Sequence, residues 1–163
     1  MKLILSAPEP INSPHYLADF ICGEVSLDEW LKRRALTNHL SGASRTFVTT
    51  ETTGRVMGYY SLAAGAVTHQ LATGAIRRNM PDPIPVLVLG RLAVAQEAQG
   101  MKVGASLLQD AFLRANTVAE NAGIRALLVH ALNDKAKRFY LQYGFQESPI
   151  HALTLMMRLA PRS

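Results

Sequence analysis

A glycine-bearing turn is the part of this sequence best suited to binding chemistry. It reads Gln99-Gly-Met-Lys-Val-Gly-Ala105 and stands between an aliphatic segment and a long helical pattern. Such a turn delivers backbone N–H groups to the N-terminus of a helix, where they attract a pyrophosphate. The sequence therefore predicts a cofactor site here, although the turn alone would equally suit a simple glycine-containing helix start.

A second group of candidate side chains lies on a short predicted helix that opens at Asn133 and ends at Gly144. Asn133, Ala136 and Tyr140 are three, four and seven residues apart, so they share one face of that helix. Tyr140 brings to this face a phenol, which can donate a hydrogen bond or a proton. The alternative is a structural tyrosine that packs at the helix end.

Several other chemistries find no support. The single cysteine, Cys22, excludes an internal disulfide and a cysteine-based metal cluster, and it is expected to be a packing residue rather than a nucleophile. His130 has no second histidine or carboxylate at metal-ligand spacing, so no metal site is predicted. The chain also lacks a Gly-x-Ser-x-Gly motif, which argues against a serine nucleophile.

The elements that must position these residues can be read from the hydrophobic pattern. With 163 residues, 48% of them hydrophobic, the chain is expected to form one domain over residues 1–163. The apolar run Leu3-Ile-Leu5 is too short for a signal peptide or a membrane span, so the protein is predicted to be soluble and cytoplasmic. The predicted elements are a strand at 2–7, a helix from the capping box Ser26-Leu-Asp-Glu29, a hairpin of 45–50 with 55–62 (the second strand extending toward Val67), a loop at 69–85, a strand at 86–94, a helix at 103–122, a strand at 126–132 and the helix from Asn133.

The order of elements from Val86 to Phe145 resembles the acyl-coenzyme A core of the GCN5-related N-acetyltransferase (GNAT) family. The resemblance implies an α/β (α+β) GNAT fold, with a mixed central sheet of six to seven strands flanked by about four helices, and acetyl-CoA as cofactor. The family turn has the pattern Gln/Arg-x-x-Gly-x-Gly/Ala, and Lys102 stands at its first glycine. Gly100, two residues earlier, could share the conformational demand.

The resemblance also implies roles for individual residues. In the family, the central strand carries a bulge, which Gly90 would mark here, and its main chain binds the cofactor. The helix asparagine contacts the pantetheine arm, the small alanine lets the cofactor pass, and the tyrosine hydroxyl points at the sulfur, so Tyr140 is the catalytic candidate. Phe139, beside Tyr140, is expected to turn toward the core. The implied cofactor-binding residues are Leu92, Ala93, Val94, Gln99, Gly100, Lys102, Val103, Gly104, Ala105, Asn133, Ala136 and Phe139. A plain core strand at 86–94 would carry the same side chains, so the sequence alone leaves both readings of that strand open.

The missing general base points to the kind of amine that would be acetylated. The strand 86–94 contains no Asp, Glu or His. A lysine amine, with a pKa of about 10.4, would need a base, whereas an α-amine, at about 7.7 to 8.0, is substantially neutral at cellular pH. The sequence therefore favours an α-amino substrate.

Charge and further motifs suggest what carries this amine. The net charge is +5 and the sequence pI is about 9.7, values at which binding to nucleic acid becomes worth considering. Over nearly its full length the chain is similar to the acetyltransferase toxins of type II toxin–antitoxin systems, in motifs such as Ala7-Pro-Glu-Pro10, Gly23-Glu-Val-Ser-Leu-Asp-Glu-Trp-Leu31 and Arg77-Arg-Asn-Met-Pro-Asp-Pro-Ile-Pro85. This similarity implies acetylation of aminoacyl-tRNA, arrest of translation and a ribbon-helix-helix antitoxin as partner. The residues expected to face tRNA on one surface are Lys32, Arg33, Arg34, Arg45, Arg77 and Arg78.

Alternatives remain open from the residues alone. They are an acetyltransferase of a small amine or a protein N-terminus, and a non-catalytic CoA-binding co-repressor. The sequence names neither the tRNA nor the oligomeric state, which could be a monomer or a homodimer.

Overall fold

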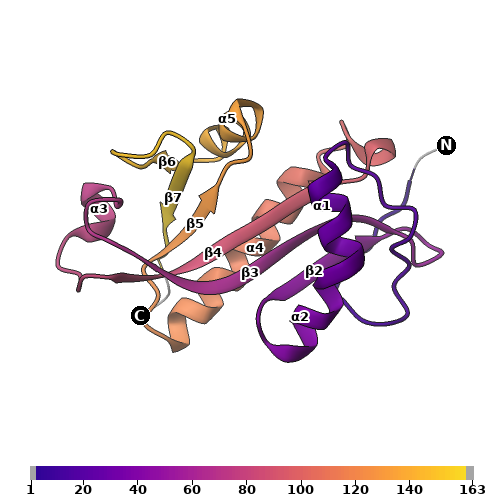
Figure 1. The fold of residues 1–163 in the computed structure, drawn as a ribbon, viewed down its shortest axis with the longest axis horizontal. Helices are drawn as coiled ribbons and strands as arrows, with labels where there is room; N and C mark the ends of the chain where they lie inside the picture. Colours follow the sequence, from indigo (N-terminus) through magenta and orange to yellow (C-terminus); the bar gives the residue numbers. More distant parts are fainter. Residues whose placement is uncertain (1–2, 161–163) are drawn as a thin grey trace. The chain divides into compact units, whose positions relative to one another are not determined.

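A computed structural model describes residues 3–160, and Figure 1 traces their elements along the chain. The strands are β1 Glu9–Pro10, β2 Arg45–Thr50, β3 Val56–Val67, β4 Ile84–Val94, β5 Ala126–His130, β6 Gln146–Glu147 and β7 Thr154–Arg158. The helices are α1 Val25–Trp30, the π-helical turn η1 Leu31–Ala35, α2 Leu36–Ser41, α3 Gly74–Arg77, the 3₁₀ turn η2 Gln96–Ala98, α4 Val103–Asn121 and α5 Asp134–Gln142.

The described strands form one seven-stranded sheet with the order β1-β2-β3-β4-β5-β7-β6. Strand β4 pairs with β5 in parallel, whereas β2 with β3 and β5 with β7 are antiparallel, so the sheet is mixed. Because α1, η1 and α2 follow one another without a break, residues 3–160 contain four helical segments besides η2. This confirms the predicted fold class.

Two compact units can be distinguished, and each is described by itself. Unit 1 comprises Met1–Ala63 with Arg91–Ala111, and unit 2 comprises Ala64–Gly90 with Phe112–Ser163. Strands β3 and β4 and helix α4 each contribute residues to both units.

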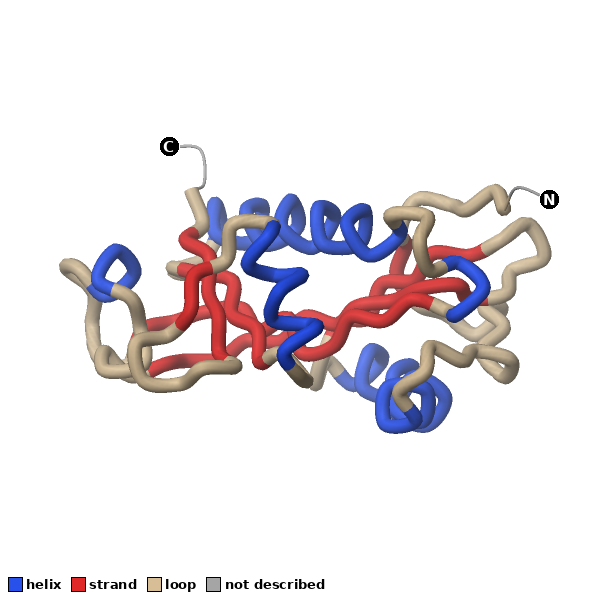
Figure 2. Tube along the Cα trace, turned by 90° about the horizontal axis from the view of Figure 1, so that it is seen from above, coloured by secondary structure: helices blue, strands red, loops and turns tan. Residues whose placement is uncertain are grey.

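The sheet of unit 1 is covered by helices on both faces, and two neighbouring residues of β3 show why. Successive residues of a strand point to opposite faces. A Cβ added at Gly58 would lie 3.0 Å from the Leu107 side chain of α4, while the Tyr59 ring stacks on Trp30 of α1 at 6.0 Å. In Figure 2 the long helix α4 and the α1–α2 segment accordingly lie on opposite sides of the strands of unit 1. Gly58 thus permits the close approach of α4.

The N-terminal segment differs from the sequence prediction in two places. Residues 3–7 form no strand, although the Ser6 N–H donates to the Thr50 carbonyl at 2.8 Å, and β1 covers only Glu9–Pro10. Pro8, which lies between them, has no N–H to extend the ladder. Residue 2 of the predicted strand lies outside the described residues. The predicted capping box is wrong as well, since α1 begins at Val25 after the N-cap residue Glu24, without a side-chain cap. Asp28 instead accepts the Cys22 N–H at 2.9 Å and is buried.

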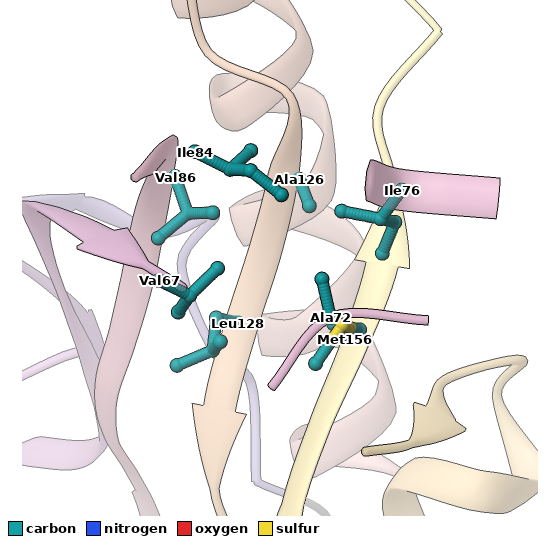
Figure 3. Close-up of a cluster of buried hydrophobic side chains, with 8 residues drawn as sticks. All are labelled: Val67, Ala72, Ile76, Ile84, Val86, Ala126, Leu128 and Met156. Carbon is teal, nitrogen blue, oxygen red and sulfur yellow. The ribbon is translucent and has the colours of Figure 1, made fainter. Parts of the chain in front are cut away.

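Unit 2 has a hydrophobic cluster that reaches into the segment predicted to be a loop. Figure 3 shows Ile76 of α3 lying beside Ala126 of β5, with Ala72 near Met156 of β7. The segment 69–85 therefore holds the short helix α3, the start of β4 and three buried side chains, those of Ala72, Ile76 and Ile84. The cluster comprises Val67, Ala72, Ile76, Ile84, Val86, Ala126, Leu128 and Met156.

The remaining predicted elements are confirmed. The hairpin forms, and β3 extends to Val67 as expected. Helix α4 begins at Val103, and α5 follows the N-cap residue Asn133, whose Oδ1 accepts the Ala136 N–H at 2.9 Å. Gly144 has a φ of +96° after the end of α5, a conformation that glycine adopts without strain.

We expect Leu128→Ala to lower the free energy of unfolding by about 2 to 5 kcal/mol, because Leu128 is 1% exposed within the cluster. The control is Leu113→Ala, which removes the same atoms at a side chain that is 57% exposed and should cost less than about 0.5 kcal/mol. Urea unfolding of both variants measures the difference. Equal losses would show that the cluster does not act as a core.

Candidate functional site

The glycine-bearing turn of unit 1 has an unusual backbone. Gly100 has a φ of +85° and Lys102 a φ of +62°, so two residues lie in the left-handed region on either side of Met101. Alternation of left- and right-handed residues turns successive N–H groups toward a common point, which makes an anion-binding concavity. The left-handed conformation of Lys102 also explains why a glycine is expected at this place in the family turn.

Gln99 acts as a brace for this turn. Its Nε2 donates to the carbonyl oxygen of Val94 at 2.9 Å and to that of Cys22 at 2.7 Å. One side chain therefore joins the end of β4, the segment before α1 and the start of the turn. Both amide hydrogens are used within the protein, so Gln99 fixes the turn through its donors.

The end of β4 supplies main-chain groups next to the turn. The parallel ladder with β5 covers Val86–Leu89, and the remaining residues of β4, from Gly90 to Val94, are outside that ladder. Leu92 and Val94 are half-buried, and Ala93 is 5% exposed. The Ala95 N–H donates to Met57 at 2.8 Å, which anchors the strand end to β3.

A stack of three side chains beside these residues was not anticipated from the sequence. The Arg91 guanidinium lies 4.2 Å from the Trp30 ring centroid, and Trp30 stacks on Tyr59 with an interplanar angle of 12°. The Tyr59 hydroxyl donates to the Leu27 carbonyl at 2.7 Å, and burial raises the pKa of Tyr59, so it stays protonated. The available signal was a lone arginine within an otherwise aliphatic strand.

Cys22 is held as a thiol. Burial, reinforced by its hydrogen bond with Asp28, raises the pKa of Cys22 to about 11. Because the thiolate is the reactive form, this agrees with a packing residue rather than a nucleophile.

In unit 2, Tyr140 is a buried phenol on α5. It is 6% exposed, and its ring packs edge-on against Phe145 at 5.4 Å between centroids. Burial raises the pKa of Tyr140, which keeps its proton in place. Among the described residues of unit 2, the Tyr140 hydroxyl has no hydrogen-bond partner, so its donor is available to a ligand.

Phe139 does not occupy the place predicted for it. It is half-buried and contacts the partly exposed Tyr143 at 5.1 Å between ring centroids. The prediction that Phe139 would turn toward the core is not met, since Phe139 stays half-buried while Tyr140, whose ring centroid lies 5.2 Å from that of Phe139, is the buried residue of the two. Asn133 and Ala136 lie in the first turn of the same helix, as expected.

The predicted tRNA-facing residues lie in both units. Arg33 forms an ion pair with Glu29 at 2.7 Å, and Arg45 donates to the His39 carbonyl. All of these residues are exposed, so they are accessible to a polyanion. Lys32, Arg33, Arg34 and Arg45 belong to unit 1, and Arg77 and Arg78 to unit 2.

Two structural features are absent from residues 3–160. No group of three His, Cys, Asp or Glu side chains that could hold a metal ion occurs in this part of the chain. Of the helices in the same range, none has both the length and the apolar character needed to cross a membrane.

The chain is similar to acetyltransferases of known structure and name. A family model described as an acetyltransferase (GNAT) domain matches residues 42–147. A relative from Mycobacterium tuberculosis named "tRNA-acetylating toxin" is 49% identical over 152 residues, which cover 93% of this chain and 91% of the relative. The solved structure of AtaT complexed with acetyl-methionyl-tRNAfMet is similar with a TM-score of 0.87 and 27% identity, over 95% of both chains. A mutant of AtaT bound to the C-terminus of the antitoxin AtaR and to acetyl-CoA is similar with a TM-score of 0.80 and 28% identity, over 94% of this chain and 92% of that one.

The left-handed Lys102 generates a stability prediction. Lys102→Gly should raise the free energy of unfolding by about 1 kcal/mol, because glycine adopts a φ of +62° without a Cβ clash. Lys102→Ala is the matched control, since it removes the charge but keeps the Cβ and should bring no such gain. Thermal and urea unfolding measure both variants; stabilisation by alanine equal to that by glycine would point to charge rather than backbone strain.

Proposed function

Because the chain belongs to the GNAT acetyltransferase family, we propose that it is a toxin that uses acetyl-CoA to acetylate the α-amine of aminoacyl-tRNA and so blocks translation. The observation that carries this proposal is the full-length similarity to a relative named a tRNA-acetylating toxin. A structural neighbour in complex with an acetylated aminoacyl-tRNA supports the same substrate class.

The proposed cofactor residues fit a nucleotide thioester. The concave turn around Gly100 and Lys102 offers N–H groups, with those of Val103, Gly104 and Ala105 at the start of α4, to a pyrophosphate. Leu92, Ala93 and Val94 would offer main-chain groups to the pantetheine arm, and the family resemblance assigns Asn133, Ala136 and Phe139 to the same cofactor. Acetyl-CoA supplies an activated acetyl group whose carbonyl carbon accepts the amine.

We assign Tyr140 the role of proton donor to the departing sulfur. Its raised pKa keeps the hydroxyl protonated, and its donor is unused within unit 2. Main-chain N–H groups of β4 would stabilise the oxyanion that forms when the amine nitrogen attacks the thioester. Acetyl-CoA would supply the carbon–sulfur bond that breaks; Tyr140 would donate its hydroxyl proton to the sulfur and recover a proton, through water, from the amine, which loses its extra proton as the amide forms. A neutral α-amine requires no strong base, which suits a strand β4 without Asp, Glu or His.

We also propose that both units act as one acetyltransferase domain over residues 1–163. The family model matches a range with residues of both units, and three elements run through both. The antitoxin partner is proposed from the AtaT–AtaR complex, and a ribbon-helix-helix type from the sequence resemblance. A cytoplasmic location follows from a tRNA substrate, and self-association into a homodimer is left to measurement.

The experiment that tests the proposed function is mass spectrometry of charged tRNA after incubation with the protein and acetyl-CoA. We expect the aminoacyl ester to gain one acetyl group on its α-amine, because a neutral amine attacks the thioester. Deacylated tRNA is the control and should gain none. Acetylation of polyamines or peptide N-termini with charged tRNA unchanged would contradict the proposal.

Tyr140→Phe should lower the rate of acetyl transfer by about 10² to 10⁴, because it removes a positioned acid from a buried ring and little else. Tyr143→Phe is the matched control, since it removes a hydroxyl from the same segment at a residue that is 41% exposed. Single-turnover acetylation of charged tRNA gives the rate, and thermal melting checks the fold. A folded Tyr140→Phe protein that works within about threefold of wild type would remove the tyrosine from the mechanism.

A further inference from the structure

Arg125 stands at a fixed point of unit 2, at the start of β5. Its N–H donates to the Pro85 carbonyl at 2.9 Å, and its carbonyl accepts the Leu159 N–H at 3.1 Å. The backbone of Arg125 is therefore tied to β4 on one side and to the end of β7 on the other. The position from which the Arg125 side chain extends is therefore well defined.

The guanidinium of Arg125 binds the end of helix α3. Nε donates to the Ile76 carbonyl at 3.0 Å, and Nη2 donates to the carbonyls of Ala75 at 3.2 Å and of Arg78 at 3.3 Å. The last carbonyls of a helix have no partner within it. The planar fork of arginine can satisfy several of them at once, which an ammonium group cannot do with the same geometry. Arg125 thus clamps residues 75–78, which include Arg77 and Arg78.

The rest of the segment 69–81 is also fixed by side-chain packing and hydrogen bonds. Ile76 is 2% exposed within the hydrophobic cluster, and the Ser148 hydroxyl donates to the Leu71 carbonyl at 2.6 Å. The ring nitrogen Nε2 of His69 lies 2.9 Å from the carbonyl oxygens of both Met80 and Pro81. The segment 69–81 therefore presents Arg77 and Arg78 from a packed base, although its sequence predicts a loop.

Positive charge gathers around the clamp without a carboxylate to balance it. Arg158 of β7 pairs across the sheet with Ala126, next to Arg125. The Leu159 N–H bond to the Arg125 carbonyl keeps Arg158 beside Arg125, and burial, followed by repulsion from Arg158, lowers the pKa of Arg125. Among residues 3–160, neither of them nor Arg77 and Arg78 forms an ion pair with an acidic side chain, and Asp82 accepts the His69 N–H instead. Like charges held together in this way favour a bound anion.

We propose that Arg125 is a positioning residue for the RNA substrate, which holds Arg77 and Arg78 in place beside Arg158 so that these three exposed arginines contact RNA phosphates. This inference rests on the proposed function for the identity of the polyanion. It adds Arg158 to the surface expected to contact RNA, and it gives Arg125 a role that involves no contact with RNA itself.

The experiment measures charged-tRNA affinity against salt concentration, and KM and kcat of acetylation, for the full chain. Arg158→Ala should lower the slope of log affinity against log salt by about one, because one phosphate contact is lost. Arg138→Ala, which removes an exposed charge from α5 of the same unit, is the control and should leave the slope unchanged. Arg125→Met should weaken RNA affinity about tenfold and raise KM with kcat unchanged.

A double-mutant cycle separates positioning from a general loss of stability. In a background of Arg77→Ala with Arg78→Ala, Arg125→Met should cause no further loss of RNA affinity, because nothing remains for it to position. An equal loss in both backgrounds would overturn the proposal, and so would an unchanged salt slope in Arg158→Ala. If Arg125→Met does not fold, Arg125→Lys, which keeps the charge but not the fork, takes its place in the cycle and should show the same dependence on background.

Two further outcomes distinguish this inference from the proposed function. Wild-type protein that fails to bind or acetylate charged tRNA would overturn the function, and the inference with it. Wild-type protein that acetylates tRNA, with all variants unchanged in RNA affinity but weakened for duplex DNA, would leave the function intact and overturn the inference.

Discussion

The structure depends on strand β4, which continues beyond the end of its parallel pairing with β5. The ladder of β4 with β5 ends at Leu89, while β4 continues to Val94. Main-chain N–H and C=O groups withdrawn from water need partners, so residues beyond a ladder must find them elsewhere. At the far end of β4 the protein provides one such partner itself, since the Gln99 side chain donates to the Val94 carbonyl. Between these points lie Leu92 and Ala93, whose main chain the proposed function assigns to acetyl-CoA.

The remaining features of each unit suit a protein that binds its cofactor through few charged side chains. In unit 1, the Gln99 brace fixes a turn in which Gly100 and Lys102 are left-handed, so that N–H dipoles can bind phosphate with a single lysine charge nearby. In unit 2, α5 keeps a neutral phenol in an apolar setting beside Phe145, where ionisation is unfavourable. The proposed reaction uses these groups as donors and leaves the amine to lose its proton to water.

Much of this arrangement was predictable because it follows from residue types and spacings within short segments of the sequence. The spacing of Asn133, Ala136 and Tyr140 fixes their common face, and the N-cap role of Asn133 follows from its residue type. What escaped prediction depends on contacts between distant residues. Ser26 and Glu29 were predicted to form a capping box, whereas Glu24 is the N-cap residue of α1 and Asp28 accepts the Cys22 N–H. Arg125 carried no local signal that it would reach the carbonyls of α3. The left-handed conformation of Lys102 could not be predicted, because the rest of the turn imposes it and the lysine residue type does not indicate it.

The central claim is that the main chain of Leu92–Val94 and the turn from Gly100 to Ala105, both in unit 1, bind acetyl-CoA together. Backbone amide NMR of the full chain during a titration with acetyl-CoA tests this most directly. The claim predicts that the amide signals of Leu92–Val94 and of the turn from Gly100 to Ala105 shift together and yield one dissociation constant. Shifts confined to one of these two segments, or different dissociation constants for them, would contradict it.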